Sequence, residues 1–129
     1  MEYLADTVAL ILHIAKEKRL GKQAKKILFE ADQGVHRIYV SPISYMEILY
    51  LSEKNRIGID LQKVINFVGK VDNYCEIPIT GYLITIAQTI DDVPELHDRI
   101  LAASAQFLDV PIITSDKVIQ ASKHCRCVW

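Results

Sequence analysis

The sequence predicts a three-layer α/β domain in which helices flank a mainly parallel central sheet. Short apolar segments alternate along the chain with longer stretches of helical periodicity, a pattern typical of parallel strands joined by right-handed crossovers. Half of the 129 residues are hydrophobic, so the chain is able to bury a core of its own. No linker is needed at this length, and residues 1–129 are therefore expected to form a single domain.

The first half of the chain is expected to contain two strands and four helices. In order, they are strand 2–5, helix 8–14, a helix with its core stripe at 24–31, strand 38–40 and a helix from Pro42 through Arg56. Ser41 is suited to cap this last helix, and Pro42 to occupy its first position. Gly58 ends it, and Asp60 can cap the following helix, whose core stripe is expected at Leu61, Val64, Ile65 and Val68.

The second half is expected to add three strands and three helical segments. In order, they are strand 74–77, a helix capped by Thr80 and running to about Gln88, a helix from Pro94, a doubly buried strand at 110–114, a helical turn at 118–122 and an edge strand at 125–129. Asp91 and Asp92 are interpreted as loop residues. The long helix is expected to turn Leu96, Ile100, Ala103 and Phe107 toward the core.

Four acidic residues occupy positions where a loop or a helix face meets the predicted sheet. Asp6 and Asp116 each follow a strand, Glu47 lies on an apolar helix stripe, and Asp98 shares a face with small residues. All four can converge on one rim, at the carboxyl ends of the strands. So many carboxylates in one crevice require bound protons or a divalent metal, and oxygen ligands favour Mg²⁺ or Mn²⁺ over zinc. Taken alone, Asp6 is better explained as a helix cap.

The basic residues are concentrated in one segment of a chain whose net charge is only −1. The chain therefore lacks the overall positive field of a protein that coats nucleic acid. Two interpretations of the basic segment remain open: it is a solvated face, or it guides RNA phosphates. If the basic segment lies beside the four acids, the RNA-guiding interpretation is favoured. The candidate RNA-binding residues are Lys18, Arg19, Lys22, Lys25 and Lys26.

Cysteine usage and the N-terminal residues indicate a cytoplasmic protein that does not enter a membrane. Cys75, Cys125 and Cys127 form no Cys-x-x-Cys pair, which suits a reducing compartment. No basic segment followed by an apolar one marks a targeting signal. A zinc site made by the cysteines and His124 would match no common ligand spacing.

Four segments in register resemble the PIN-domain nucleases, and within them the VapC-type toxins of bacterial and archaeal toxin–antitoxin pairs. The segments are Tyr3-Leu-Ala-Asp-Thr-Val-Ala-Leu10, Ser41-Pro-Ile-Ser-Tyr-Met-Glu-Ile48, His97-Asp-Arg-Ile-Leu-Ala-Ala103 and Ile113-Thr-Ser-Asp116. The resemblance implies a single PIN-like domain over residues 1–129, metal-dependent hydrolysis of RNA, a homodimer and a small inhibitory antitoxin. It implies an acidic set of Asp6, Glu47, Asp98 and Asp116. Many family members carry another acid near the third segment, where this chain has His97.

The leading hypothesis is an endoribonuclease that uses one or two Mg²⁺ ions, for which Mn²⁺ would substitute. The metal ligands would be Asp6, Asp98 and Asp116, with Glu47 acting directly or through water. Thr7, Thr114 and Ser115 would orient these carboxylates. The alternatives are a PIN nuclease that is not a toxin, and a catalytically silent PIN-fold module that binds RNA or acts as a scaffold. A phospho-accepting receiver domain would instead need two adjacent acids after the first strand, where this chain has Asp6 and Thr7.

Overall fold

The computed structural model describes all residues from Met1 to Trp129 and contains one five-stranded sheet. The strands are β1 (Glu2–Ala5), β2 (Arg37–Val40), β3 (Tyr74–Glu76), β4 (Ile112–Ile113) and β5 (Cys127–Val128). Their order is β3-β2-β1-β4-β5, and every neighbouring pair is parallel. The predicted α/β class with a mainly parallel sheet is therefore confirmed.

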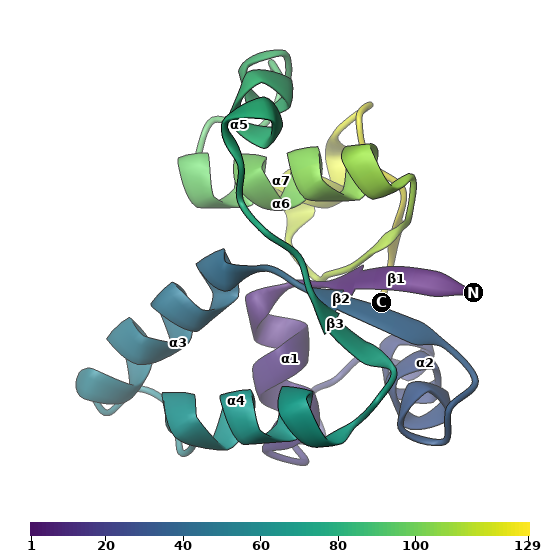
Figure 1. The fold of residues 1–129 in the computed structure, drawn as a ribbon, viewed down its shortest axis with the longest axis vertical. Helices are drawn as coiled ribbons and strands as arrows, with labels where there is room; N and C mark the ends of the chain where they lie inside the picture. Colours follow the sequence, from purple (N-terminus) through teal and green to yellow (C-terminus); the bar gives the residue numbers. More distant parts are fainter.

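Helices cover both faces of the sheet. They are α1 (Thr7–Ile14), α2 (Lys22–Asp32), α3 (Pro42–Glu53), α4 (Leu61–Lys70), α5 (Gly81–Gln88), α6 (Leu96–Leu108) and α7 (Lys117–Ala121). Figure 1 shows α5, α6 and α7 on one side of the sheet and α1, α2 and α4 on the other, with α3 projecting outward beside α4. No helix combines the length and the hydrophobicity needed to cross a bilayer.

The centre of the sheet is apolar because β1 and β4 are covered on both faces. Leu4 pairs with Tyr39 of β2 on one side and with Ile112 of β4 on the other. Leu4, Ile112 and Ile113 have no exposed surface, which confirms the doubly buried strand predicted for this part of the chain. Since all strands are parallel, their carboxyl ends meet at one edge of the sheet, and the loops that follow β1 and β4 lie next to each other there.

Helix starts were predicted well, with one exception. Ser41, Asp60 and Thr80 each accept a hydrogen bond from the first turn of the helix that follows, as expected of caps. The long helix does not begin at Pro94, because Glu95 is its cap and Leu96 its first residue. Helix α3 stops at Glu53, before the predicted Arg56, because Asn55 adopts a left-handed conformation with a φ of 54°.

The prediction that Leu96 and Phe107, at the two ends of α6, face the core was wrong. Leu96 is 65% exposed and Phe107 is 58% exposed, whereas the buried residues are those from Leu101 to Ala105. The reason is that α6 packs against two partners. Leu101 and Ala105 pack on the sheet, while Ala102 and Ala103 pack on α5, so the buried face is centred on the small residues. In α4, Ile65 is also 40% exposed, contrary to its predicted place in the core.

Candidate active site

Asp6 lies at the junction of β1 and α1, where it is almost completely buried. Its Oδ1 accepts a hydrogen bond of 2.7 Å from the backbone N–H of Ala9, so its predicted role as a helix cap is confirmed. Burial raises the pKa of Asp6 to about 6, against the lowering effect of hydrogen bonds from Thr114 and Ala9. The carboxylates of Asp116 and Glu47 raise this pKa further. Asp6 is therefore a cap that also lies in the field of other acids.

Asp116 lies beyond β4 and begins α7. Its Oδ1 accepts hydrogen bonds from the backbone N–H groups of Val118 and Ile119, at 2.9 and 3.0 Å. The hydroxyl oxygen of Thr114 accepts the backbone N–H of Asp116 at 3.0 Å, and the same hydroxyl lies close enough to Asp6 to lower the pKa of that carboxyl. One fully buried threonine therefore lies between the two segments that carry these acids.

Glu47 approaches the same region from α3. The Thr7 hydroxyl donates to its Oε1 at 3.1 Å and lies 2.9 Å from the hydroxyl of Ser44. Glu47 is half-buried, and this burial raises its pKa, while the hydrogen bond from Thr7 and the ring of His97 lower it. Thr7 thus orients the Glu47 carboxylate by a direct hydrogen bond. Ser115 is half-buried between Thr114 and Asp116.

Asp98 lies in the first turn of α6 and is the fourth of the predicted acids. Burial raises its pKa to about 6, and the carboxylates of Asp116, Glu95, Glu47 and Asp6 add to the effect in that order. Four carboxylates from four separate segments therefore act on one another, as their positions in the sequence predict. No three of them bring ligand oxygens within 4.8 Å of one another.

A fifth carboxylate, Glu95, belongs to the same electrostatic neighbourhood and was not predicted. Its Oε2 accepts the backbone N–H of Asp98 at 2.8 Å, and its Oε1 lies 3.1 Å from Nδ1 of His97. Its charge also raises the pKa of both Asp98 and Glu47. The signal for Glu95 was its position three residues before Asp98, which is the spacing between a helix cap and the N–H that it accepts.

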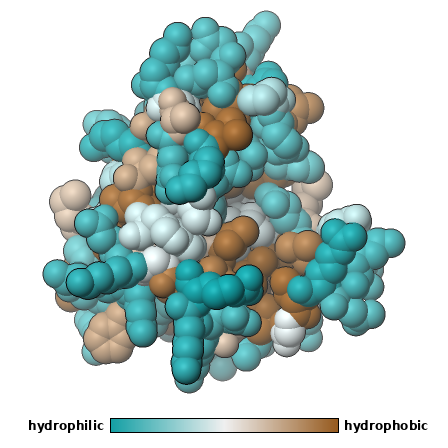
Figure 2. All heavy atoms as spheres, turned by 180° about the vertical axis from the view of Figure 1, so that it is seen from behind, coloured by the Kyte–Doolittle hydropathy of each residue, from teal (hydrophilic) through white to brown (hydrophobic).

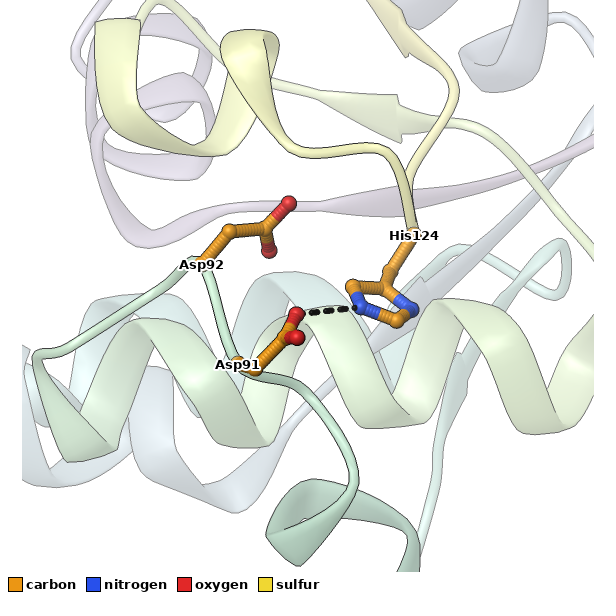
Figure 3. Close-up of side chains that lie close together, drawn as sticks. All are labelled: Asp91, Asp92 and His124. Atoms are coloured by element: carbon orange, nitrogen blue, oxygen red, sulfur yellow. Dashed lines mark hydrogen bonds and ion pairs between the residues drawn. The ribbon is translucent and has the colours of Figure 1, made fainter.

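A second acidic group, Asp91 and Asp92 with His124, is the only set of three metal-ligating side chains whose ligand atoms lie within 4.8 Å of each other (Figure 3). Its carboxylate oxygens are already engaged. Asp92 accepts from the Ser122 hydroxyl at 2.7 Å and from the Lys123 N–H at 2.9 Å, while Asp91 pairs with His124 at 3.1 Å. The Ser122 hydroxyl lowers the pKa of Asp92, and His124 lowers that of Asp91.

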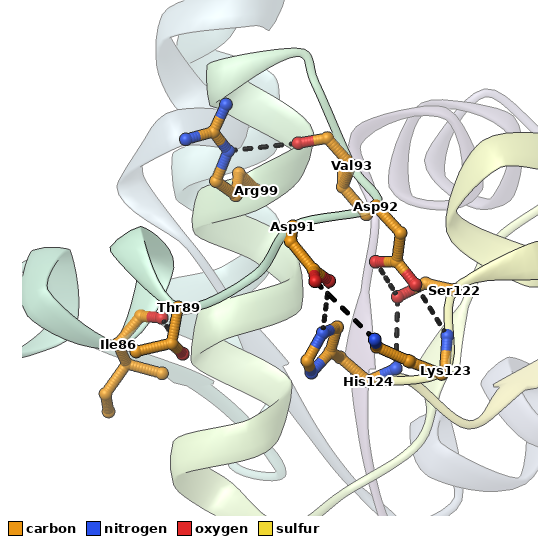
Figure 4. A network of polar contacts seen from close by, with 9 residues as sticks. All are labelled: Ile86, Thr89, Asp91, Asp92, Val93, Arg99, Ser122, Lys123 and His124. Carbon is orange, nitrogen blue, oxygen red and sulfur yellow. Dashed lines mark hydrogen bonds and ion pairs between the residues drawn. The ribbon is translucent and has the colours of Figure 1, made fainter.

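These residues join the loop between α5 and α6 to the segment after α7, and we refer to Asp91, Asp92, Ser122, Lys123 and His124 as the acidic clasp (Figure 4). The prediction that Asp91 and Asp92 are loop residues is confirmed. Figure 4 also shows Arg99 bonded to the carbonyl of Val93, at 3.0 Å, which fixes the loop that enters α6. The considered zinc site does not form, because Cys75 and Cys127 lie on opposite edge strands.

The basic segment lies away from the acids. Its lysines, Lys18, Lys22, Lys25 and Lys26, line a groove of about 1250 Å³ between the C-terminal end of α1, α2 and α4, and Arg19 is exposed next to Lys18. The rear view in Figure 2 shows apolar atoms in the lower half of the molecule, bordered by hydrophilic side chains. Asp6 is at the opposite end of α1, and eight helical residues correspond to about 12 Å. Basic residues that guide RNA were expected to lie beside the acids. Their distance from the acids argues against an RNA-binding role for Lys18, Arg19, Lys22, Lys25 and Lys26.

Residues 3–123 match the family model of the PIN domain. The chain belongs to the PIN domain family. This match confirms the resemblance on which the sequence-based expectation of a PIN fold rested. A search of curated proteins gave no match.

Three solved structures share the fold of the chain. VapBC2 from Rickettsia felis, bound to a DNA fragment from the promoter, is similar with a TM-score of 0.71 and 12% identity, over 99% of this chain and 98% of that one. DNA-bound VapBC from Salmonella typhimurium has a TM-score of 0.68 and 16% identity, over 99% and 97%. A toxin–antitoxin complex from Klebsiella pneumoniae has a TM-score of 0.65 and 20% identity, over 98% and 96%.

Proposed function

We propose that this chain is a single PIN-type domain that acts as a metal-dependent endoribonuclease, the toxin of a VapBC-type toxin–antitoxin pair. The observation that carries the proposal is the convergence of Asp6, Glu47, Asp98 and Asp116, which is evident in their effects on one another's pKa. A catalytically silent scaffold would have no use for acids whose ionised forms are destabilised by burial and mutual repulsion. Membership of the PIN domain family supports the same conclusion.

The four acids fit a divalent cation by their chemistry. All the donors are carboxylate oxygens, which suits Mg²⁺ or Mn²⁺, and a cation would offset the repulsion that raises the pKa of Asp6 and Asp98. Bound Mg²⁺ supplies Lewis-acid activation of a water and stabilisation of the charge that develops on the phosphodiester. Glu95 is a candidate for the additional acid that the family resemblance left open.

The protein's own residues would then position the ligands. Thr114 accepts the backbone N–H of Asp116 and lies beside Asp6, and Thr7 orients Glu47. Ser115 stays a predicted orienting residue. Asp98 is fixed through its backbone, because Glu95 caps the helix turn that carries it. The acids are thus held by neighbours on the domain's rigid elements, which preserves the ligand geometry.

We further propose a small antitoxin as partner, since the similar solved structures are toxin–antitoxin complexes. The groove between α1, α2 and α4 suits an amphipathic segment that carries acidic residues. Phe29, which is 63% exposed, and the half-buried Phe67 provide apolar surface, and lysines surround them. A homodimer is also proposed, since α5 and α6 expose large apolar side chains. These are Tyr82, Ile84, Leu96 and Phe107.

The proposed activity is tested by cleavage of single-stranded RNA by the purified protein. We expect cleavage with Mg²⁺ or Mn²⁺ and none in EDTA, because the proposed ligands provide the only means of activating water. A matched reaction in which Mg²⁺ is restored after EDTA should recover the activity. Cleavage that persists after exhaustive chelation would contradict a metal-dependent mechanism.

A further inference from the structure

The outer half of α3 presents an exposed aromatic ring between two cations. Tyr50 is 52% exposed. Lys54 Nζ lies 5.9 Å from the centroid of its ring, and the guanidinium carbon of Arg56 lies 6.0 Å from it. Contacts of this length are at the outer limit of a cation–π interaction, so the cations are held near the ring while their charges stay free to meet an anion.

This group is continuous with the proposed active site. Glu47 and Tyr50 are three residues apart on one stripe of α3, and Lys54 is the C-cap of this helix. Three helical residues correspond to an axial rise of about 4.5 Å, so Tyr50 lies less than one turn beyond Glu47 along α3. The basic groove, in contrast, lies at the far end of α1. Glu53 is a nearby exposed acid on α3. Lys54, Arg56 and Glu53 together still carry a net positive charge.

An aromatic face beside mobile cations matches the chemistry of single-stranded nucleic acid. Unpaired bases stack on aromatic side chains irrespective of sequence, and Lys or Arg groups neutralise the adjoining phosphates. Tyr and Arg are also enriched in protein–protein interfaces, so the experiment includes a leucine variant, which keeps an apolar protein contact but cannot stack a base. We propose that Tyr50, with Lys54 and Arg56, stacks and neutralises a nucleotide of single-stranded RNA next to the bond that is cleaved. This inference rests on the proposed ribonuclease function.

The ring is tested by comparing Tyr50→Ala, Tyr50→Leu and Tyr50→Phe. Binding of a fluorescently labelled single-stranded RNA is measured by anisotropy in an Asp98→Asn background, where cleavage is expected to be lost. We expect Tyr50→Ala and Tyr50→Leu to weaken binding roughly 5- to 150-fold, which is the range for loss of one stacked base, and Tyr50→Phe to bind as the parent does. In the active protein, the Ala and Leu variants should raise KM more than they lower kcat.

The cations are tested through the salt dependence of the same binding. Replacing Lys54 and Arg56 with Gln should flatten the slope of log affinity against log salt by about 0.7 for each phosphate that is no longer neutralised. The matched control is Lys22→Gln with Lys25→Gln in the basic groove, which should leave the slope unchanged. An altered slope in that control together with an unaltered slope in the first pair would overturn the proposal and return the RNA-binding role to the basic groove.

Failure of the stacking proposal and failure of the proposed function give different results. If wild type cleaves RNA and Tyr50→Leu binds RNA as the parent does, the ribonuclease stands and the stacking contact is refuted. That outcome would assign the exposed ring to a protein contact, which leucine can also make. If wild type neither binds nor cleaves RNA, both proposals fail together.

Discussion

Two buried threonines lie among the acids. Thr7 donates to Glu47, and Thr114 accepts the backbone N–H of Asp116 and lies close enough to Asp6 to lower the pKa of that carboxyl. Both threonines are buried, so their hydroxyls have few other partners. The Glu47 carboxylate is therefore oriented before any ligand arrives, while its burial also destabilises its charge.

The raised pKa values of Asp6 and Asp98 predict opposite pH trends for stability and metal response. Each pKa rises from 3.8 to about 6 on folding, mainly through burial. The folded state therefore holds these protons more tightly than the unfolded chain. The stability that protonation contributes is present at low pH and is lost as pH rises from about 4 to about 6. Metal binding needs the ionised form, so the Mg²⁺-induced rise in melting temperature should grow as pH passes through about 6.

Melting curves of wild type and Asp98→Asn, recorded with EDTA and with Mg²⁺ across about pH 4 to pH 8, measure both trends. The Asn variant should lose part of the pH dependence in EDTA, because one of the two shifted groups is gone. A Mg²⁺ effect as large at low pH as at neutral pH would contradict carboxylate ligation by these residues.

At the level of elements, the acidic clasp and the proposed active site are two acidic groups with different tasks. The carboxylates of the clasp accept hydrogen bonds from Ser122, Lys123 and His124, and their pKa values are lowered. Burial raises the pKa values of Asp6, Glu47 and Asp98 in the proposed site. Close spacing of ligand atoms therefore identifies the clasp, whereas destabilised charge identifies the site that gains from a cation.

Removing Asp92 should separate the two groups experimentally. We expect Asp92→Ala to lower the melting temperature, because the side chain ties the loop before α6 to the segment after α7. RNA cleavage and the Mg²⁺-induced rise in melting temperature should both remain. Asp116→Asn serves as the matched comparison, since it should show the reverse pattern. Loss of the Mg²⁺ response in Asp92→Ala, with cleavage abolished, would move the metal site to the clasp.

Across the whole molecule, the length of α1 separates two regions of opposite charge. The acids gather where β1 and β4 end, and the lysine-lined groove lies at the other end of α1. This separation is compatible with the proposals that a chain with a net charge of −1 binds a metal in one region and an acidic partner in another. It also allows the two ligands to bind without competing for the same side chains.

Much of the fold follows from local patterns in the sequence. Caps such as Ser41 and Asp60, and the apolar run before Thr114, specify elements through their immediate neighbours. Which side of α6 is buried could not be predicted in this way. The helix has two apolar stripes, and its packing against α5 determines which residues are buried. The position of the basic segment likewise depends on the path of the chain and not on its local composition.

The four acids were identified as a set by the sequence, and the structure adds how they interact. Their convergence depends on strand order, which no local pattern specifies. Glu95 was overlooked because the residue directly beside Asp98 in the sequence is His97, whereas the helical turn brings the residue three positions earlier to the Asp98 backbone. The roles of these acids as metal ligands stay predictions.

The most direct test of a four-carboxylate metal site is the melting temperature of wild type and Asp6→Asn, each in EDTA and in Mg²⁺, with RNA cleavage measured on the same samples. Asn caps a helix as well as Asp does, so the fold should persist. We expect the variant to melt at an unchanged or higher temperature in EDTA, to gain less from Mg²⁺, and to cleave no RNA. Asp98→Asn and Asp116→Asn should behave alike. Full cleavage by Asp6→Asn, together with an unaltered Mg²⁺ response, would contradict the site.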